Sequence, residues 1–147
     1  MPKKIKRPPV VVIDTNILIS YLFGGKTITT LIDSIENDAY QPVISDFLEF
    51  EVIATISKPK ISRRVDISDA LEFMAAWKNI ALYVTPRCSV SVCRDFSDNE
   101  ILACALEASA DYIISGDNDL LVLKSFHEIP IVTPAFFVTN VLHCALN

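Results

Sequence analysis

Short apolar runs alternate along this chain with longer stretches in which apolar and polar residues are mixed. The short runs are rich in β-branched residues and do not alternate in polarity, which is typical of strands buried on both faces of a parallel sheet. They predict five strands, at residues 10–13, 42–44, 82–84, 112–114 and 131–132. The stretches between them are long enough for crossover helices, so the pattern predicts an α/β fold with helices on both faces of the sheet.

Hydroxyl and carboxyl residues mark the starts of several of these helices, because their side chains can accept the unpaired N–H groups of a first turn. An acid three residues further on would complete a capping box. The candidate starts are Ser45 or Asp46 with Glu49, Ser97 with Glu100, and Thr133 before Pro134. Pro59 is predicted to end the helix that begins at the first of these sites.

Length and composition predict one packed domain. The chain has 147 residues, 51% of them apolar, and shows no repeat and no low-complexity linker, so we expect a basic tail at 1–9 and a single domain at 10–147. The apolar run after the tail is interrupted at once by Asp14 and Asn16. It is too short and too polar for a membrane span or a secretory signal, so we expect a cytoplasmic protein with no membrane partner. The four cysteines show no CxxC pairing, which favours buried, reduced thiols.

Charge is distributed unevenly along the chain. The net charge of −5 argues against a protein that holds nucleic acid mainly through phosphate contacts. Residues 1–64, however, carry 9 Lys and Arg against 7 Asp and Glu, whereas residues 65–147 carry 4 against 11. A local basic cluster lies in the first half, at Lys58, Lys60, Arg63 and Arg64. It could follow an RNA backbone or simply be a solvated charged surface, and both interpretations stay open.

Acidic residues follow the ends of predicted strands or begin predicted helices. Asp14 directly follows the first strand and Asp117 comes soon after the fourth, while Asp98 lies in the first turn of a helix and Glu51 lies one turn into another. Because ligands of an open parallel sheet bind beyond the carboxyl ends of its strands, we expect these carboxylates to converge there. Each one alone is equally well explained as a helix cap or a solvated acid, so the prediction depends on the set.

Grouped carboxylates repel one another, and bound cations are one way to keep them together. Hard oxygen ligands favour Mg²⁺ or Mn²⁺. Placed against a phosphodiester, such ions can lower the pKa of an attacking water and stabilise the leaving oxygen, without a histidine or serine nucleophile. The acidic set therefore indicates metal-assisted hydrolysis of a phosphodiester.

Four ordered motifs carry this chemistry: VVIDTNILIS, PVISDFLEFEVIATISKPKI, VCRDFSDNEILACALEASADYIISGDNDLLVL and IPIVTPAFFV. Together, from about residue 10 to about residue 138, they resemble the PIN-domain family, particularly its toxin subgroup from toxin-antitoxin systems. The resemblance implies a three-layer α/β/α domain with a five-stranded parallel sheet of order 3-2-1-4-5. It also implies Mg²⁺- or Mn²⁺-dependent endoribonuclease activity. In that strand order the first and fourth strands are neighbours, which would place Asp14 beside Asp117.

The resemblance further implies roles for individual residues. The catalytic and metal-binding acids correspond to Asp14, Glu51, Asp98 and Asp117, with Asn16 and Ser115 as supporting polar residues. Asp119 follows in DNDLL and is either a further acid of the metal site or the cap of a short helix. Asp95 is a rival for the third acidic position. We favour Asp98, because it lies at a helix N-terminus and is followed by Asn99.

Aromatic residues are a separate candidate for RNA contact. Phe73, Met74 and Trp77 recur at helical spacing, and for them core or dimer packing is favoured over a base-stacking platform. His127 and His143 lie far in sequence from the acidic motifs and are given no catalytic role.

The sequence favours a ribonuclease with an RNA substrate and an antitoxin protein as partner. The alternative is a catalytically degenerate PIN domain that binds RNA or a protein without cutting it. It is suggested by the third acidic motif, which has only two acids, Asp95 and Asp98. An aspartyl phosphoacceptor is a third hypothesis, but DTN lacks the second acid that a DxD or DD pair would supply. The apolar richness of so small a chain makes a homodimer a reasonable expectation. RNA sequence preference does not follow from these observations.

Overall fold

The central feature of the fold is one sheet of strands with the order β3-β2-β1-β4-β6-β5. The computed structural model describes residues 7–144, so Lys3, Lys4 and Lys6 of the predicted tail lie outside the described residues. The strands are β1 Val10–Ile13, β2 Gln41–Ile44, β3 Leu82–Tyr83, β4 Tyr112–Ile114, β5 Ser125–Phe126 and β6 Ile129–Val132.

The predicted parallel order 3-2-1-4-5 is confirmed, with β6 in the fifth place. The sixth strand, β5, was not predicted. It pairs antiparallel with β6 across a tight turn in which His127 and Glu128 both have positive φ, 50° and 66°. Such a turn allows two strands to be joined by two residues. The prediction missed β5 because its two residues, Ser125 and Phe126, are not part of an apolar run.

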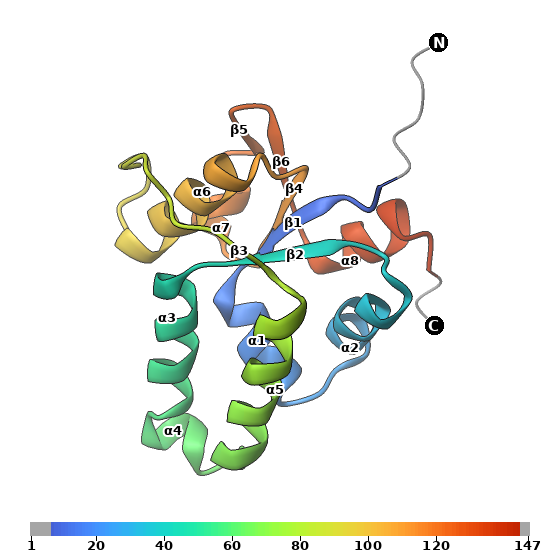
Figure 1. Cartoon of the computed structure of the whole chain (residues 1–147), viewed down its shortest axis with the longest axis vertical. Coiled ribbons are helices and arrows are strands. Elements are labelled where there is room, and N and C mark those ends of the chain that lie inside the picture. The colour runs from blue at the N-terminus through green and yellow to red at the C-terminus, as the bar shows by residue number, and fades with distance from the viewer. Residues whose placement is uncertain (1–6, 145–147) are drawn as a thin grey trace.

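Helices cover both faces of the sheet, as predicted. They are α1 Thr15–Tyr21, α2 Lys26–Asp33, α3 Asp46–Ile56, α4 Pro59–Ser62, α5 Ile67–Ile80, α6 Phe96–Ala108, α7 Asn118–Leu121 and α8 Pro134–Phe136. A 3₁₀ turn at Ser34–Asn37 and a π turn at Phe137–Val141 complete the set. Figure 1 shows α6 on one side of β1 and β2, and α1, α2, α3 and α5 on the other. The result is a three-layer α/β/α arrangement.

Two of the predicted helix caps are confirmed. Ser45 accepts the Leu48 N–H at the start of α3 (3.3 Å), and Thr133 caps α8, which begins at a proline. Because Ser45 rather than Asp46 is the cap, the expected capping box with Glu49 does not follow. Glu49 instead forms an ion pair with Lys78 of α5, at 2.9 Å between Oε2 and Nζ.

The core contains β1, β2, β4 and the inner faces of the helices, whereas both residues of β3 are exposed. Trp77 is only 2% exposed and Met74 is equally buried, while Phe73 packs between Tyr21 and the Trp77 ring. The interpretation of this aromatic group as core packing is thus confirmed. Within residues 7–144, no helix is both long and apolar enough to cross a membrane.

The cysteines follow the prediction in part. All four thiols are free, so no disulfide joins any of them. Cys104 is fully buried, and burial raises the pKa of its thiol to about 12. Cys93 and Cys144 are only half-buried, and Cys88 is exposed, so the expectation of burial was wrong for these three. Apolar neighbours in sequence were a poor guide where the chain forms an exposed loop.

The packing of Trp77 makes a testable prediction. Replacing it with alanine (Trp77→Ala) should lower the free energy of unfolding by about 3–5 kcal/mol, because a large buried side chain leaves a cavity. The matched control is Leu71→Ala on the same helix, which is exposed and should change stability by less than about 1 kcal/mol. Urea unfolding measures both. Equal, small effects would show that Trp77 is not part of the core.

Candidate functional site

The ends of β1 and β4 meet at the edge of the sheet where the acidic residues gather. Ile13 pairs with Ile114 in register, and the N–H of Asp14 donates to the carbonyl of Ile114 at 2.9 Å. One residue further along, the Ser115 hydroxyl donates to Oδ2 of Asp14 at 2.7 Å. The same Ser115 oxygen accepts the N–H of Asp117 at 2.9 Å. The predicted neighbourhood of Asp14 and Asp117 therefore follows directly from strand pairing.

Asp14 has two structural roles at once. Its Oδ1 accepts the Asn16 N–H at 3.2 Å and caps α1, while Oδ2 accepts from Ser115. Burial raises the pKa of Asp14 above its ordinary value; the hydrogen bonds from Ser115 and Asn16 oppose that rise, and the charges of Asp117 and Glu51 add to it. The Asn16 side chain lies on the exposed side of the same turn.

Glu51 reaches the same edge from α3. Its Oε2 accepts the Ser97 hydroxyl of α6 at 2.7 Å, and its Oε1 accepts the Thr15 hydroxyl of α1 at 3.4 Å. A helix glutamate has several rotatable bonds, so two hydroxyl donors from different helices fix its direction. The spacing of the acids could not reveal this arrangement, because the donors lie 36 and 46 residues away in sequence.

The start of α6 supplies two acids, Asp95 and Asp98. The expectation that Ser97 caps this helix was wrong, because α6 begins two residues earlier and Asp95 is its cap, accepting the Ser97 N–H at 3.0 Å. Releasing Ser97 from capping is what lets its hydroxyl reach Glu51. Asp98 is in the first turn and is only 5% exposed. Burial first, then the negative charges of Asp117, Asp95, Asp14 and Asp119, raise the pKa of Asp98 to about 7.

Side-chain hydrogen bonds of Asn99 and Arg94 hold the loop before α6 next to the site. The Asn99 side chain accepts the Cys93 N–H at 2.7 Å and donates to the Cys93 carbonyl at 2.8 Å. Arg94 donates through Nε and Nη2 to the two carboxylate oxygens of Asp119, at 3.1 and 3.3 Å. Asp119 therefore also holds the loop, while the cap of the short helix α7 is Asp117.

The acids and hydroxyls at this edge of the sheet surround a pocket of about 240 Å³. The pocket is lined by Asp14, Thr15, Asn16, Glu51, Thr55, Lys58, Asp95, Ser97, Asp98, Ile101 and Asp117. All four predicted acids line it, and so does Asp95, the rival for the third acidic position. A second hollow of about 320 Å³ adjoins it and shares Asp14, Asn16 and Asp117 with it.

The chemistry of the pocket fits a divalent cation. Carboxylate oxygens of Asp98, Asp117 and Asp119 lie within 4.8 Å of one another, which is close enough for one ion to touch all three. Oδ2 of Asp98 is buried and has no hydrogen-bond partner among residues 7–144. A buried polar oxygen normally has a partner, and one left bare among other carboxylates matches a cation ligand. Asp119 belongs to this group of three carboxylates, although it does not line the pocket.

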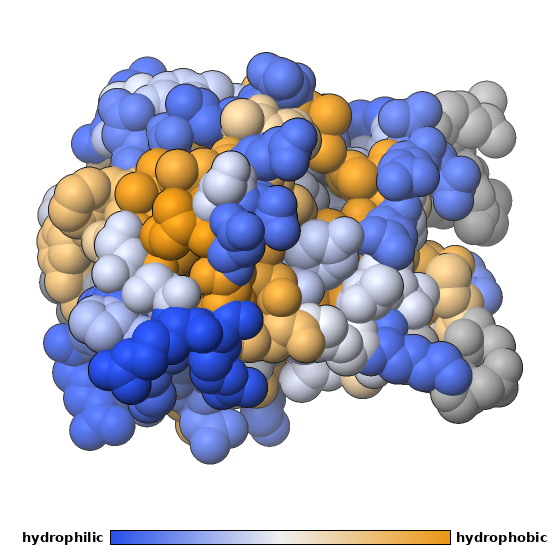
Figure 2. Space-filling view, turned by 90° about the horizontal axis from the view of Figure 1, so that it is seen from below, coloured by the Kyte–Doolittle hydropathy of each residue, from blue (hydrophilic) through white to orange (hydrophobic). Residues whose placement is uncertain are grey.

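The predicted basic cluster lies in and around the short helix α4, next to the pocket. Pro59 follows the end of α3 and opens the short helix α4, which is capped by Lys58 and followed by Arg63 and Arg64. Lys58 lines the pocket, whereas Arg64 lies over the ring of Phe23, 4.7 Å from its centroid. Figure 2, which looks onto the end of the molecule where α4 lies, shows a strongly hydrophilic area there next to an apolar one.

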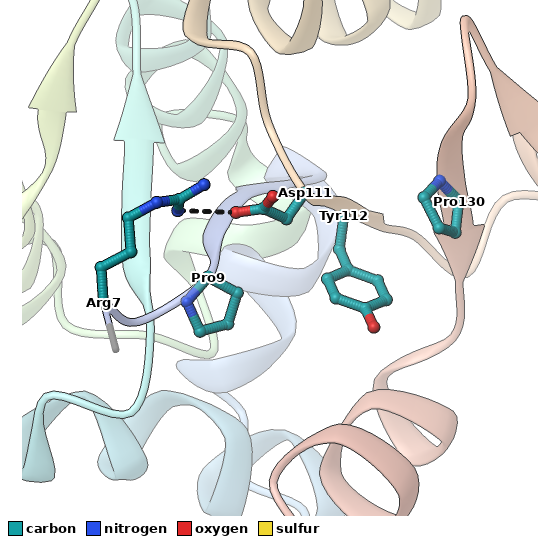
Figure 3. Close-up of a pocket in the computed structure, with 5 residues that line it drawn as sticks. All are labelled: Arg7, Pro9, Asp111, Tyr112 and Pro130. Atoms are coloured by element: carbon teal, nitrogen blue, oxygen red, sulfur yellow. Dashed lines mark hydrogen bonds and ion pairs between the residues drawn. The ribbon is translucent and has the colours of Figure 1, made fainter. Parts of the chain in front are cut away.

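A different pocket lies at the opposite ends of the strands. It has a volume of about 310 Å³ and is lined by Arg7, Pro9, Asp111, Tyr112 and Pro130 (Figure 3). Asp111 accepts from Arg7 at 3.0 Å and from the Val10 N–H at 2.7 Å. Burial raises the pKa of Asp111, but these two donors outweigh it and lower the pKa below its ordinary value. This contact ties the start of β1 to β4 and is structural.

Sequence reasoning missed Thr15 and Ser97 as functional neighbours. Thr15 was treated as part of the DTN motif and Ser97 as a cap, and neither was linked to Glu51. The only signal available was their position next to Asp14 and Asp98, which is too common a pattern to identify a contact between helices.

Comparison with known families agrees with this geometry. The sequence model described as the PIN domain matches residues 10–119, well over half of the chain. Comparison with the curated proteins gives no match. PIN domains are generally nucleases, and they typically use divalent metal ions. The matched segment contains β1, β4 and every acid of the pocket and the carboxylate cluster, and the chain belongs to the PIN domain family.

Proposed function

We propose that this chain is an endoribonuclease that hydrolyses RNA phosphodiester bonds with Mg²⁺ or Mn²⁺. The observation that carries the proposal is the buried Oδ2 of Asp98, which lies in a cluster of carboxylates and has no hydrogen-bond partner among the described residues. The bound ions would supply the chemistry of lowering the pKa of an attacking water and stabilising the leaving oxygen. Asp14, Glu51, Asp98 and Asp117 are the residues that would hold them, with Asp119 next to the last two.

The residues of this chain prepare the site for that role. Ser115 holds Asp14 at the end of β1, and Ser97 and Thr15 hold Glu51 on the facing wall. Because these hydroxyls donate to carboxylates, the acids keep their direction when no substrate is present. Lys58 lies on the same pocket wall as Glu51 and supplies a positive charge for a phosphate. The resemblance of the motifs to the toxin subgroup extends the proposal to a toxin that an antitoxin protein restrains.

Asp14 provides the first test. Asp14→Asn keeps the size of the side chain but removes one carboxylate, so cleavage of RNA with Mn²⁺ should fall at least about 100-fold. Cleavage should also stop with a chelator and return when Mn²⁺ is restored. The measurement is the rate of cleavage of a labelled RNA. Undiminished cleavage by Asp14→Asn would contradict the assignment, while intact RNA binding without any cleavage would favour a degenerate PIN domain.

Asp98 provides a second test, through stability. Folding raises its pKa from 3.8 to about 7, so the folded chain binds the extra proton between these values and the charged form destabilises the fold above pH 7. In chelator at pH 8, Asp98→Asn should therefore raise the free energy of unfolding by about 2 kcal/mol, or the Tm by roughly 5 °C. The gain should shrink as the pH falls from 7 toward 4. Mn²⁺ should stabilise the native chain and not this variant.

The matched control for Asp98 is Asp69, which has the same place in the first turn of α5, a helix also capped by an aspartate. Asp69 is exposed and lies outside the pocket, so Asp69→Asn should give no gain at any pH. Thermal unfolding at several pH values, with chelator and with Mn²⁺, measures all of these effects. A gain common to both variants would point to general charge relief instead of the acidic cluster.

Lys58 provides a third test, on RNA binding. In an Asp14→Asn background with Mg²⁺, Lys58→Gln should weaken RNA binding and lower the slope of log affinity against log salt by about 1. Arg64→Gln is the matched control, because Arg64 packs on the Phe23 ring outside the pocket. Titration of a labelled RNA at several salt concentrations gives the slopes. Identical slopes for the Lys58 variant and the parent would show that Lys58 does not contact an RNA phosphate.

A further inference from the structure

A solvent-exposed aromatic ring begins α6, between two residues that line the acidic pocket. Phe96 is the first residue of α6, and its side chain is 64% exposed. Its neighbours in sequence, Asp95 and Ser97, both line the pocket. The ring packs edge-to-face against Phe47 of α3, with 5.3 Å between centroids and 85° between planes. Phe47 is half-buried, so it anchors Phe96 while leaving much of the Phe96 ring in contact with solvent.

The register of α3 places this aromatic pair in line with the acids. Phe47, Glu51 and Thr55 are spaced by four residues each, so they share one face of α3, and Lys58 follows just beyond the end of the helix. The last three line the pocket, and Phe47 begins the row. Along α3 the row runs from an aromatic ring, past a carboxylate, to a hydroxyl, over about 12 Å, and the Lys58 cation lies beyond it. That length is enough for more than one nucleotide of a bound strand.

We propose that Phe96, supported by Phe47, stacks against the unpaired base of a nucleotide adjacent to the phosphodiester held at the carboxylates. The inference rests on the proposed function for the position of that phosphodiester. An aromatic side chain next to a backbone-binding site is suited to this role, because every nucleobase has a π face and stacking tolerates any sequence. The base must be unpaired, since a duplex covers its faces with neighbouring bases. Phe96 would then hold the strand on one side of the acids, and Lys58 would hold a phosphate on the other.

Phe50 separates this hypothesis from a general apolar surface. It lies on the same helix as Phe47 and is 67% exposed, nearly the same as Phe96. Phe50, however, is outside the row, does not line the pocket and forms no ring contact with a described residue. A surface that binds a protein through its apolar side chains would use both phenylalanines. A stacking site at the pocket uses Phe96 alone.

The experiment measures binding without cleavage. In an Asp14→Asn background with Mg²⁺, a short single-stranded oligoribonucleotide carrying 2-aminopurine is titrated, and its fluorescence reports both affinity and stacking. Phe96→Ala should weaken binding by about 5- to 100-fold, while Phe96→Trp and Phe50→Ala should stay within about 3-fold of the parent. Phe96→Leu, which keeps the apolar contact with Phe47 but loses the ring, should behave as Phe96→Ala does.

An abasic scan identifies the base. With Phe96 present, removing one particular base should weaken binding; with Phe96→Ala the same removal should have no further effect. Equal losses for Phe96→Ala and Phe50→Ala, or a scan with no position coupled to Phe96, would overturn the stacking site. If RNA is cleaved in a metal-dependent way and no coupling is found, the stacking site fails and the ribonuclease proposal stands. If coupling is found and the native chain does not cleave, the stacking site stands and the ribonuclease proposal fails.

Discussion

The hydrogen bond from Ser115 to Asp14 joins the ends of two neighbouring parallel strands, and the acidic pocket depends on it. It exists because Ile13 pairs with Ile114, which brings the next residues of both strands to the same edge. The same hydroxyl accepts the Asp117 N–H, so one buried serine orients an acid from each strand. A shift of either strand by one residue would turn these side chains to the wrong face. Strand register therefore determines the position of the first two carboxylates.

Capping and metal binding are compatible roles for these acids. Asp14, Asp95 and Asp117 each cap a helix through Oδ1, and Asp98 lies in the first turn of α6. A carboxylate has two oxygens, so one can satisfy a backbone N–H while the other remains available. The N-termini of helices also carry partial positive charge, which offsets some of the repulsion among the acids. Asp98 lies in such a first turn, yet its buried Oδ2 has no hydrogen-bond partner among residues 7–144.

Sequence patterns were most informative where a feature is set by neighbouring residues. The strand runs predicted a parallel sheet, the family resemblance implied its order, and each of Asp14 and Asp117 could be placed from the strand it follows. The start of α6 was misplaced, because Asp95 and Ser97 are both good caps and only the folded loop selects between them. The contact of Ser97 with Glu51 could not be predicted from sequence patterns, since it joins two helices whose relative position depends on the packing of the whole core.

The two walls of the pocket differ in how firmly they are held. The wall formed by the sheet is fixed by backbone pairing, because the Asp14 N–H itself belongs to the β1–β4 ladder. On the wall formed by α3 and α6, Glu51 is held by side-chain hydrogen bonds, accepting from Thr15 of α1 and from Ser97 of α6. The carboxylate cluster draws on both sides of the pocket, with Asp117 and Asp119 beyond β4 and Asp98 in α6. A cation bound to all three would therefore link the edge fixed by strand pairing to the helix that carries Asp98.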